Sequence, residues 1–161
     1  MEKSLLATLL MFSFLCSNDT SCHGSDRNIQ PTSIENHHTG QNMTSDNINI
    51  KVGSKVFAAT LFDNSSAKAF KEMLPLTINM TELNGNEKYG DLSKSLPINS
   101  VNPGTIKNGD LMLYGSNTLV LFYKSFFTSY RYTKLGTVDD ATGLALALGS
   151  GNISLLFEGH K

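Results

Sequence analysis

The chain has 161 residues, enough for one domain of ordinary size with a leader, but not for two hydrophobic cores. It carries 13 Lys and Arg against 14 Asp and Glu, which gives a formal net charge of −1 at pH 7. Five of the acids and two of the bases precede residue 47, so the remainder is nearly neutral. Nucleic-acid binding depends on clustered basic residues that neutralise phosphates. We therefore expect no nucleic-acid partner.

The N-terminal segment indicates export. Residues 5–15 form an apolar run, which is shorter than the ~20 helical residues that span a bilayer and is typical of a secretory signal. Cys16 follows directly, and this arrangement resembles a bacterial lipoprotein signal, in which such a cysteine carries the lipid. Leu15 departs from the small residue that those signals favour. The alternative is an ordinary signal peptide that is cut after Cys16 or near Ser21.

We expect residues 1–16 to be a lipoprotein signal peptide, with the mature protein held at the membrane of the bacterial cell envelope, in the periplasm or at the outer membrane, by a lipid on Cys16. Residues 17–46 are rich in Ser, Asn, Thr and His, a composition that buries too little apolar surface to offset its ordering entropy. They are predicted to be a flexible linker. Its His37-His38 pair lacks further ligands at suitable spacing, so we expect no metal and no cofactor.

The organised part of the chain begins at residue 47 with the period-two alternation of half-buried strands. Residues 48–52 and 55–62, separated by Gly53-Ser54, predict a hairpin. Residues 63–66 offer side-chain acceptors for helix N–H groups, and the apolar spacing of residues 67–74 predicts a short helix that Pro75 ends. Residues 76–83 predict a third strand. The next segment, residues 85–108, is polar and is predicted to be a long loop.

Two apolar runs, residues 110–114 and 118–124, flank the turn Gly115-Ser116-Asn117 and predict a second hairpin. Both faces of this hairpin are apolar. We expect one face to look into the core and the other to need a second cover, either helices or a pocket for a bound molecule. Residues 130–138 predict another strand. Asp139-Asp140 can cap a short helix, which is predicted over residues 141–148. Residues 152–158 predict the last strand.

The fold class that these elements predict is mainly β. About eight short strands and two short helices over residues 47–161 suit a closed antiparallel β-barrel, because closure removes the exposed edges of an open sheet. We expect this barrel domain to be a monomer.

Four segments in order resemble the bacterial cyclophilin-like domain family. They are residues 52–77 (VGSKVFAATLFDNSSAKAFKEMLPLT), 84–89 (NGNEKY), 109–115 (GDLMLYG) and 119–124 (LVLFYK). The resemblance covers most of residues 47–158 and implies a closed barrel of the cyclophilin type, capped by helices. The larger fold is known for peptidyl-prolyl isomerisation, but a shared fold does not carry the activity across.

The residues that perform isomerisation in true cyclophilins lack counterparts here. Those enzymes press an arginine from a stretch like F-H-R-I-I-P against the prolyl amide, beside a tryptophan and a histidine. The stretch that is most similar here, residues 93–97, reads SKSLP, and the chain has no tryptophan. Arg131, between two tyrosines, is the domain's one arginine, and Lys94 lacks the planar fork of a guanidinium.

Three hypotheses for the function follow. The preferred one is a noncatalytic module that binds a peptide or a small molecule in an apolar groove. The second is a weak peptidyl-prolyl isomerase of the cell envelope that uses Arg131 or Lys94, and the third is a structural or partner-binding domain. Hydrolase chemistry is disfavoured because no nucleophile-histidine pair or carboxylate pair forms a motif. The predicted ligand-binding residues are Glu87, Tyr89, Tyr114, Phe122 and Arg131.

Overall fold

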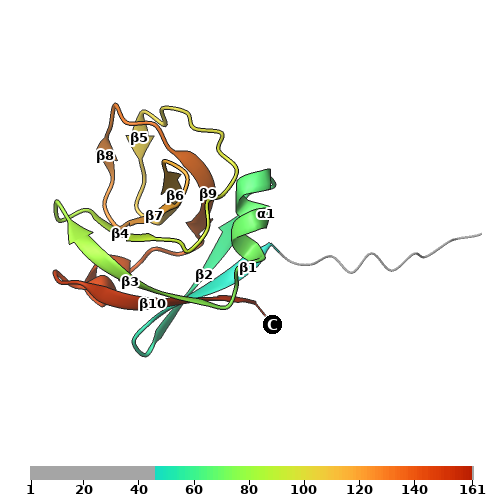
Figure 1. The fold of residues 1–161 in the computed structure, drawn as a ribbon. Helices are drawn as coiled ribbons and strands as arrows, with labels where there is room; N and C mark the ends of the chain where they lie inside the picture. The colour runs from blue at the N-terminus through green and yellow to red at the C-terminus, as the bar shows by residue number, and fades with distance from the viewer. Residues whose placement is uncertain (1–45, 161) are drawn as a thin grey trace, which may run out of the picture. The chain divides into compact units, whose positions relative to one another are not determined.

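The computed structural model describes residues 46–160, which form a closed eight-stranded antiparallel β-barrel (Figure 1). The predicted signal peptide, the linker, Cys16 and the histidine pair lie outside the described residues. The barrel order is β1-β10-β3-β4-β7-β6-β9-β2. Within the described residues, no helix is both long and apolar enough to cross a bilayer. The elements are β1 (Asn47–Val52), β2 (Lys55–Leu61), α1 (Ser65–Lys71), β3 (Leu76–Leu83), β4 (Glu87–Asp91), β5 (Thr105–Ile106), β6 (Asp110–Tyr114), β7 (Thr118–Phe122), β8 (Phe126–Phe127), β9 (Thr133–Val138), α2 (Leu144–Leu148) and β10 (Ile153–Gly159).

The β2–β9 pairing closes the barrel. It joins Leu61 to Gly136 and Ala59 to Val138. A Cβ atom added at Gly136 would lie 2.5 Å from the backbone oxygen of Thr60, closer than real Cβ contacts come. A bulge between Leu111 and Met112 in the β6–β9 ladder bends the sheet next to this seam. Gly136 and the bulge together let β2 and β9 approach each other closely enough to pair.

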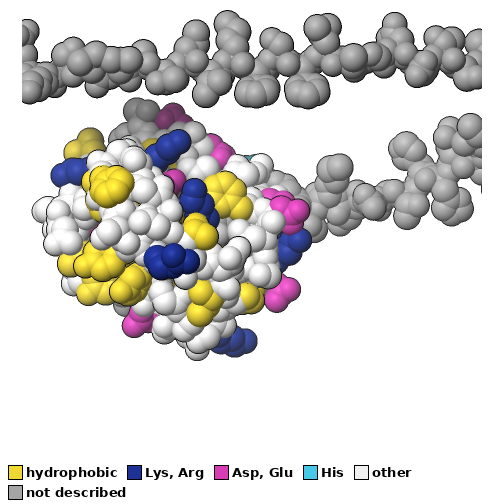
Figure 2. All heavy atoms as spheres, turned by 90° about the horizontal axis from the view of Figure 1, so that it is seen from above, with side chains coloured by type: hydrophobic (Ala, Val, Ile, Leu, Met, Phe, Trp, Pro, Cys, Tyr) yellow, Lys and Arg dark blue, Asp and Glu magenta, His cyan; other side chains and the backbone are white. Residues whose placement is uncertain are grey.

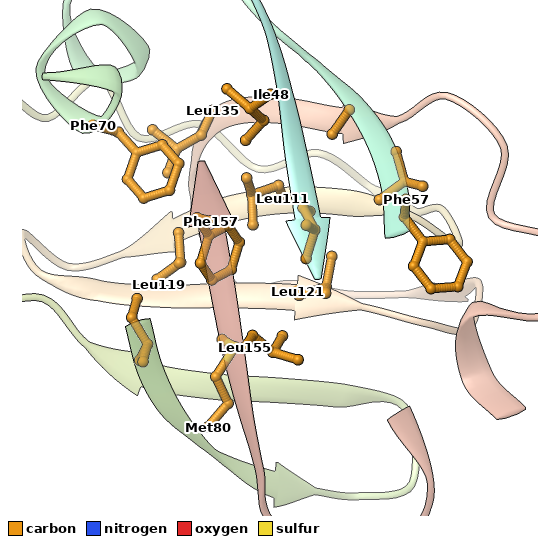
Figure 3. Close-up of a cluster of buried hydrophobic side chains, with 14 of the residues drawn as sticks. Ile48, Phe57, Phe70, Met80, Leu111, Leu119, Leu121, Leu135, Leu155 and Phe157 are labelled. Carbon is orange, nitrogen blue, oxygen red and sulfur yellow. The ribbon is translucent and has the colours of Figure 1, made fainter. Parts of the chain in front are cut away.

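The core fills the barrel with aliphatic and aromatic side chains, as Figure 3 shows. Strand residues of one parity supply most of it, because successive side chains of a strand point to opposite faces. Phe70 of α1 is fully buried and packs edge-to-face on Phe157 of β10, with ring centroids 5.7 Å apart. The helix thus belongs to the core and is more than a surface cover.

The two helices close opposite ends of the barrel. α1 follows β2 and α2 follows β9, and these two strands are antiparallel neighbours, so their C-terminal ends lie at opposite ends. Asn64 caps α1, with its Oδ1 accepting the N–H of Ala67 at 2.9 Å. Ser66 donates its hydroxyl to the carbonyl of Pro97 at 2.6 Å, which ties residues 92–97 to the same end. Leu92 and Leu96 of that segment are buried in the core.

A buried lysine secures the end that α2 covers. Lys88 of β4 is fully buried, forms an ion pair with Glu82, and donates to the carbonyls of Gly149 and Gly151 at 2.9 and 2.6 Å. Glu82 also accepts from the hydroxyl of Tyr123 at 2.7 Å. Burial acts to raise the pKa of Glu82, but the hydrogen bonds from Lys88 and Tyr123 and the lysine charge outweigh it, and the pKa is lowered. The network joins β3, β4, the residue that follows β7 and the chain after α2.

The predicted fold class is confirmed, and two local predictions are wrong. Residues 85–108 are not one long loop, because β4 and β5 lie within them. β4 reads EKYGD and places Lys88 and Gly90 on the inner face, so it shows no apolar alternation. The second helix begins at Leu144 rather than at residue 141. Its N-cap is Gly143, which has no side chain to cap the helix. Asp140 does not cap the helix and instead accepts a hydrogen bond from the N–H of Thr142 at 2.9 Å.

Replacing Lys88 by methionine should destabilise the domain by about 3–5 kcal/mol, because removing one member of a buried ion pair leaves the charge of the other without compensation. Here the carbonyls of Gly149 and Gly151 also lose their donor. Urea unfolding followed by circular dichroism measures the change. Lys134→Met is the matched control, since Lys134 is an exposed strand lysine, and it should shift stability by less than about 0.5 kcal/mol. Equal effects of the two substitutions would contradict a structural role for the Lys88 network.

Candidate functional site

The outer face of the second hairpin carries a second apolar cluster. Leu111, Leu113, Leu119 and Leu121 point into the barrel core. The alternate residues Met112, Val120 and Phe122 point outward and are nevertheless buried. Both predicted faces of the hairpin are therefore covered, each by different parts of the chain.

The cover of the outer face is the chain around the small β5–β8 sheet. β5 pairs Ile106 with Phe126 of β8, and Figure 1 shows this pair of strands on the side of the barrel away from β1 and β10. Phe122 packs against Phe126 and Tyr132, with ring centroids 5.8 and 5.5 Å away. Val101 pairs with Tyr132 through an isolated bridge and holds the chain before β5 in place.

The cover is incomplete, and it leaves an open cavity of about 640 Å³. This volume lies within the ~300–1,000 Å³ that is usual for small-molecule sites. The floor comes from the outer faces of β4, β7 and β6, and one wall comes from residues 126–132. The lining residues are Leu83, Asn84, Asn86, Glu87, Tyr89, Asp91, Tyr114, Thr118, Val120, Phe126, Phe127, Thr128, Ser129, Tyr130 and Tyr132.

The molecular face on the β5–β8 side carries exposed hydrophobic side chains. Figure 2 shows them in separate patches with charged side chains of both signs between and around them. Phe127 and Tyr130 of the cavity wall have 78% and 63% of their surface exposed. Isolated exposed apolar residues are normal, but these two adjoin a cavity. The wall of the cavity can therefore be reached from solvent.

Three tyrosine rings pack together at the cavity. Tyr114 of β6 meets Tyr130 edge-to-face at 6.3 Å between centroids, and it meets Tyr132 at 5.7 Å in a tilted arrangement. Burial, followed by the charge of Glu87, raises the pKa of Tyr132 to about 12. This phenol is therefore neutral at physiological pH, and it offers a hydroxyl for hydrogen bonding rather than a base.

Glu87 is the acidic residue of the lining that is almost fully buried. Its surface is 8% exposed, although it lies at the start of β4 on the cavity side. Its carboxylate has no hydrogen bond or ion pair with any residue between 46 and 160. Burial, with a smaller contribution from the charge of Glu82, raises the pKa of Glu87. The charged form therefore destabilises the folded protein at neutral pH.

The structure brings together three of the five residues predicted to bind a ligand. Glu87, Tyr89 and Tyr114 line the cavity. Phe122 is fully buried beneath the cavity wall and supports Phe126 and Tyr132. Arg131 is exposed, is not part of the lining, and donates its Nη2 to the carbonyl of Ser100 at 2.6 Å.

Lys94, the other predicted cation for isomerase chemistry, is exposed in the segment that follows β4 and also lies outside the lining. Sequence reasoning missed Asn86, Tyr130 and Tyr132 as cavity residues. Tyr130 and Tyr132 flank Arg131, and only the arginine was considered as a site residue there. The sequence did contain a signal for the two tyrosines. In an extended segment they alternate with Arg131 and therefore face the side opposite to the arginine.

The class of protein is defined by these features: a closed antiparallel barrel capped by two helices, with a cavity on the outer face of three strands. The sequence profile of the cyclophilin-like family matches residues 50–158, and the chain belongs to this family. A hypothetical protein of Archaeoglobus fulgidus, whose structure was solved in solution, is similar in fold with a TM-score of 0.50 and 16% identity. That match covers 75% of this chain and 99% of the other. No curated protein matches the chain in sequence.

Replacing Glu87 by glutamine should make the domain more stable at pH 7. A carboxyl whose folded pKa is raised stabilises the fold below its unfolded pKa, and this stabilisation is lost as pH rises through the folded pKa. The gain from the substitution should therefore shrink as pH falls into the range where Glu87 is protonated. The titratable groups that interact with this carboxyl are Glu82, Tyr123 and Tyr132. Thermal unfolding between pH 3 and pH 8 measures the effect, and a loss of stability at pH 7 would contradict it.

Proposed function

We propose that this cyclophilin-like domain is a noncatalytic module that binds a short peptide segment or a small molecule in the outer cavity. The observation that carries the proposal is the composition of the cavity lining. It combines six aromatic side chains with backbone and side-chain polar groups, as ligand sites do. It includes no Lys, Arg, His or Cys among the described residues.

The absence of a cation from the lining counts against the isomerase alternative for this cavity. Isomerisation must overcome a barrier of ~18–20 kcal/mol that arises from amide resonance, and a cyclophilin uses a guanidinium at the amide. Arg131, the one arginine of residues 46–160, is held by the Ser100 carbonyl outside the lining. Tyrosine rings and a carboxylate recognise ligands but do not supply that charge.

We expect no prolyl isomerisation above background in a protease-coupled assay with a prolyl tetrapeptide. Arg131→Ala and Lys94→Ala should leave this result unchanged, since neither side chain lines the cavity. Turnover by the unmodified chain that disappears in Arg131→Ala would establish the isomerase alternative instead.

Binding is tested directly with N-acetylated dipeptide amides that together contain every standard side chain. The expected result is that at least one of them shifts the backbone resonances of Tyr89, Tyr114 and Tyr130 in a ¹⁵N-labelled chain. Tyr114→Ala should weaken that binding by about tenfold, because one stacked aromatic contributes ~1 kcal/mol or more beyond its area. Leu146→Ala is the control, since Leu146 is an exposed apolar residue of α2 outside the cavity. No shift with any peptide would favour the structural or partner-binding alternative.

We further propose that the domain is lipid-anchored at the bacterial cell envelope through Cys16, which lies outside the described residues. The support is the apolar run of residues 5–15 ending directly at a cysteine. A cell expressing the full chain should incorporate labelled fatty acid into it, and a Cys16→Ser chain should lose both the label and the membrane fraction. A Cys22→Ser chain is the control and should keep both. A Cys16→Ser chain that still fractionates with membranes would refute the anchor.

A further inference from the structure

We propose that the outer cavity recognises a cation, namely an alkylammonium or guanidinium group, by seating it against Glu87 and the adjoining tyrosines. The inference rests on the proposed binding function and specifies the ligand's chemistry. The same group occurs in free amines and in lysine or arginine side chains of peptides, and the experiment below separates these sources.

The first argument is an acceptor that lacks a donor. Glu87 is more than nine-tenths buried in the cavity lining, and its carboxylate has no partner among residues 46–160. Burying most of this side chain disfavours its charged form, because the partial desolvation is not offset by an ion pair within residues 46–160. A cationic ligand supplies that ion pair. An anionic ligand would add repulsion to a charge that already lacks compensation.

The second argument comes from the neighbouring residue. Asn86 also lines the cavity, and its Oδ1 is buried with no hydrogen-bond partner in the described part of the chain. Buried acceptors without a donor are rare in native proteins. Glu87 and Asn86 are adjacent residues of the lining, and each carries an acceptor without a partner among residues 46–160. Ammonium and guanidinium groups are multiple donors with no acceptor, which matches this arrangement.

The third argument is that no cation among residues 46–160 pairs with Glu87. Lys88 is the next residue of β4, but strand alternation sends it into the barrel, where Glu82 and two carbonyls hold its ammonium. Lys124 lies over the ring of Tyr123 at 6.0 Å and borders a different surface depression together with Glu82. Asp91 is the other charged residue of the lining, and it is also acidic.

The fourth argument is the aromatic wall. The ring of Tyr114 lies 6.3 Å from that of Tyr130 and 5.7 Å from that of Tyr132, and Tyr89 adds a fourth ring to the lining. The faces of tyrosine rings attract cations through their quadrupole, and this contribution grows when the site is desolvated. An acidic group beside several tyrosines therefore discriminates for a cation over a neutral group of similar shape.

The test compares pairs of probes that differ in charge and little in shape. The probes are Nα-acetyl-lysinamide with its neutral partner Nα-acetyl-norleucinamide, Nα-acetyl-argininamide with Nα-acetyl-citrullinamide, and n-butylammonium chloride. Dissociation constants come from ¹⁵N chemical shifts of the full chain. We expect each cationic probe to bind at least about tenfold tighter than its neutral partner, since a charge-assisted hydrogen bond contributes ~1.5–3 kcal/mol.

Glu87→Gln keeps the shape of the side chain and removes its charge. It should therefore weaken the binding of the cationic probes by about tenfold or more and leave the binding of the neutral probes unchanged. Glu72→Gln is the matched control, because Glu72 is exposed at the end of α1 and outside the lining. Binding of the cations should also weaken with salt and with acid, as Glu87 becomes protonated. Tighter binding of the lysine probe than of butylammonium would identify a peptide as the source, and equal binding a free amine.

The outcomes separate this inference from the proposed function. If the neutral partners bind as tightly as the cationic probes and Glu87→Gln changes neither, the cavity is a ligand site but the inference of a cation is wrong. If no probe shifts the cavity resonances at millimolar concentration, and no dipeptide amide does so either, both are wrong.

Discussion

The structure depends on one constraint, which is that the β6–β7 hairpin is apolar on both faces. A strand that is buried on one face can leave the other to solvent, but Met112, Val120 and Phe122 cannot be exposed together without a large apolar patch. The barrel covers one face because it closes. The other face needs a cover from outside the barrel, and the chain between β4 and β9 supplies it. The cavity is the part of that second cover that stays open.

β4 connects the stability of the barrel with the chemistry of the cavity. Its alternation sends Lys88 inward and Glu87 outward, so two opposite charges that are adjacent in the sequence lie on different faces of one strand. The lysine is satisfied by four groups at the barrel end, namely Glu82, the carbonyls of Gly149 and Gly151, and the ring of Tyr123. Glu87 has no hydrogen bond or ion pair with any residue in the described range 46–160. The same backbone therefore holds a fully compensated charge inside and an uncompensated one at the cavity.

Much of the fold was predictable because its signals are local. The β1–β2 hairpin, the α1 helix ending before Pro75, and the alternation of β3 and β10 each follow from periodicity or capping within about ten residues. The two faces of β6 and β7 also followed from alternation. β4 could not be predicted in this way, since EKYGD places a buried lysine and a glycine where a strand usually has apolar residues. Only the distant partners Glu82, Gly149 and Gly151 make an inward-facing lysine stable.

The cavity was partly predictable for the same physical reason. Glu87 and Tyr89 were predicted as residues of a loop, and Tyr114 as a residue of a strand. Which face Glu87 and Tyr89 occupy depends on β4, and β4 is a strand only in its tertiary context. Arg131 illustrates the converse. Its chemistry suggested a role at a groove, yet the bridge between Val101 and Tyr132 fixes the backbone so that Tyr132 faces the cluster while Arg131 faces outward to Ser100.

The carboxylate of Glu87 bears on the proposal that the cavity binds a ligand. A guanidinium in the cavity would pair with Glu87 and remove the electrostatic penalty of its burial. The chain instead keeps its one arginine of residues 46–160 outside the lining and keeps the buried acid. Proteins tolerate such locally unfavourable groups mainly where function requires them. The cost of burying Glu87 without a partner is therefore the feature that best separates a cavity maintained for binding from a gap left by imperfect packing.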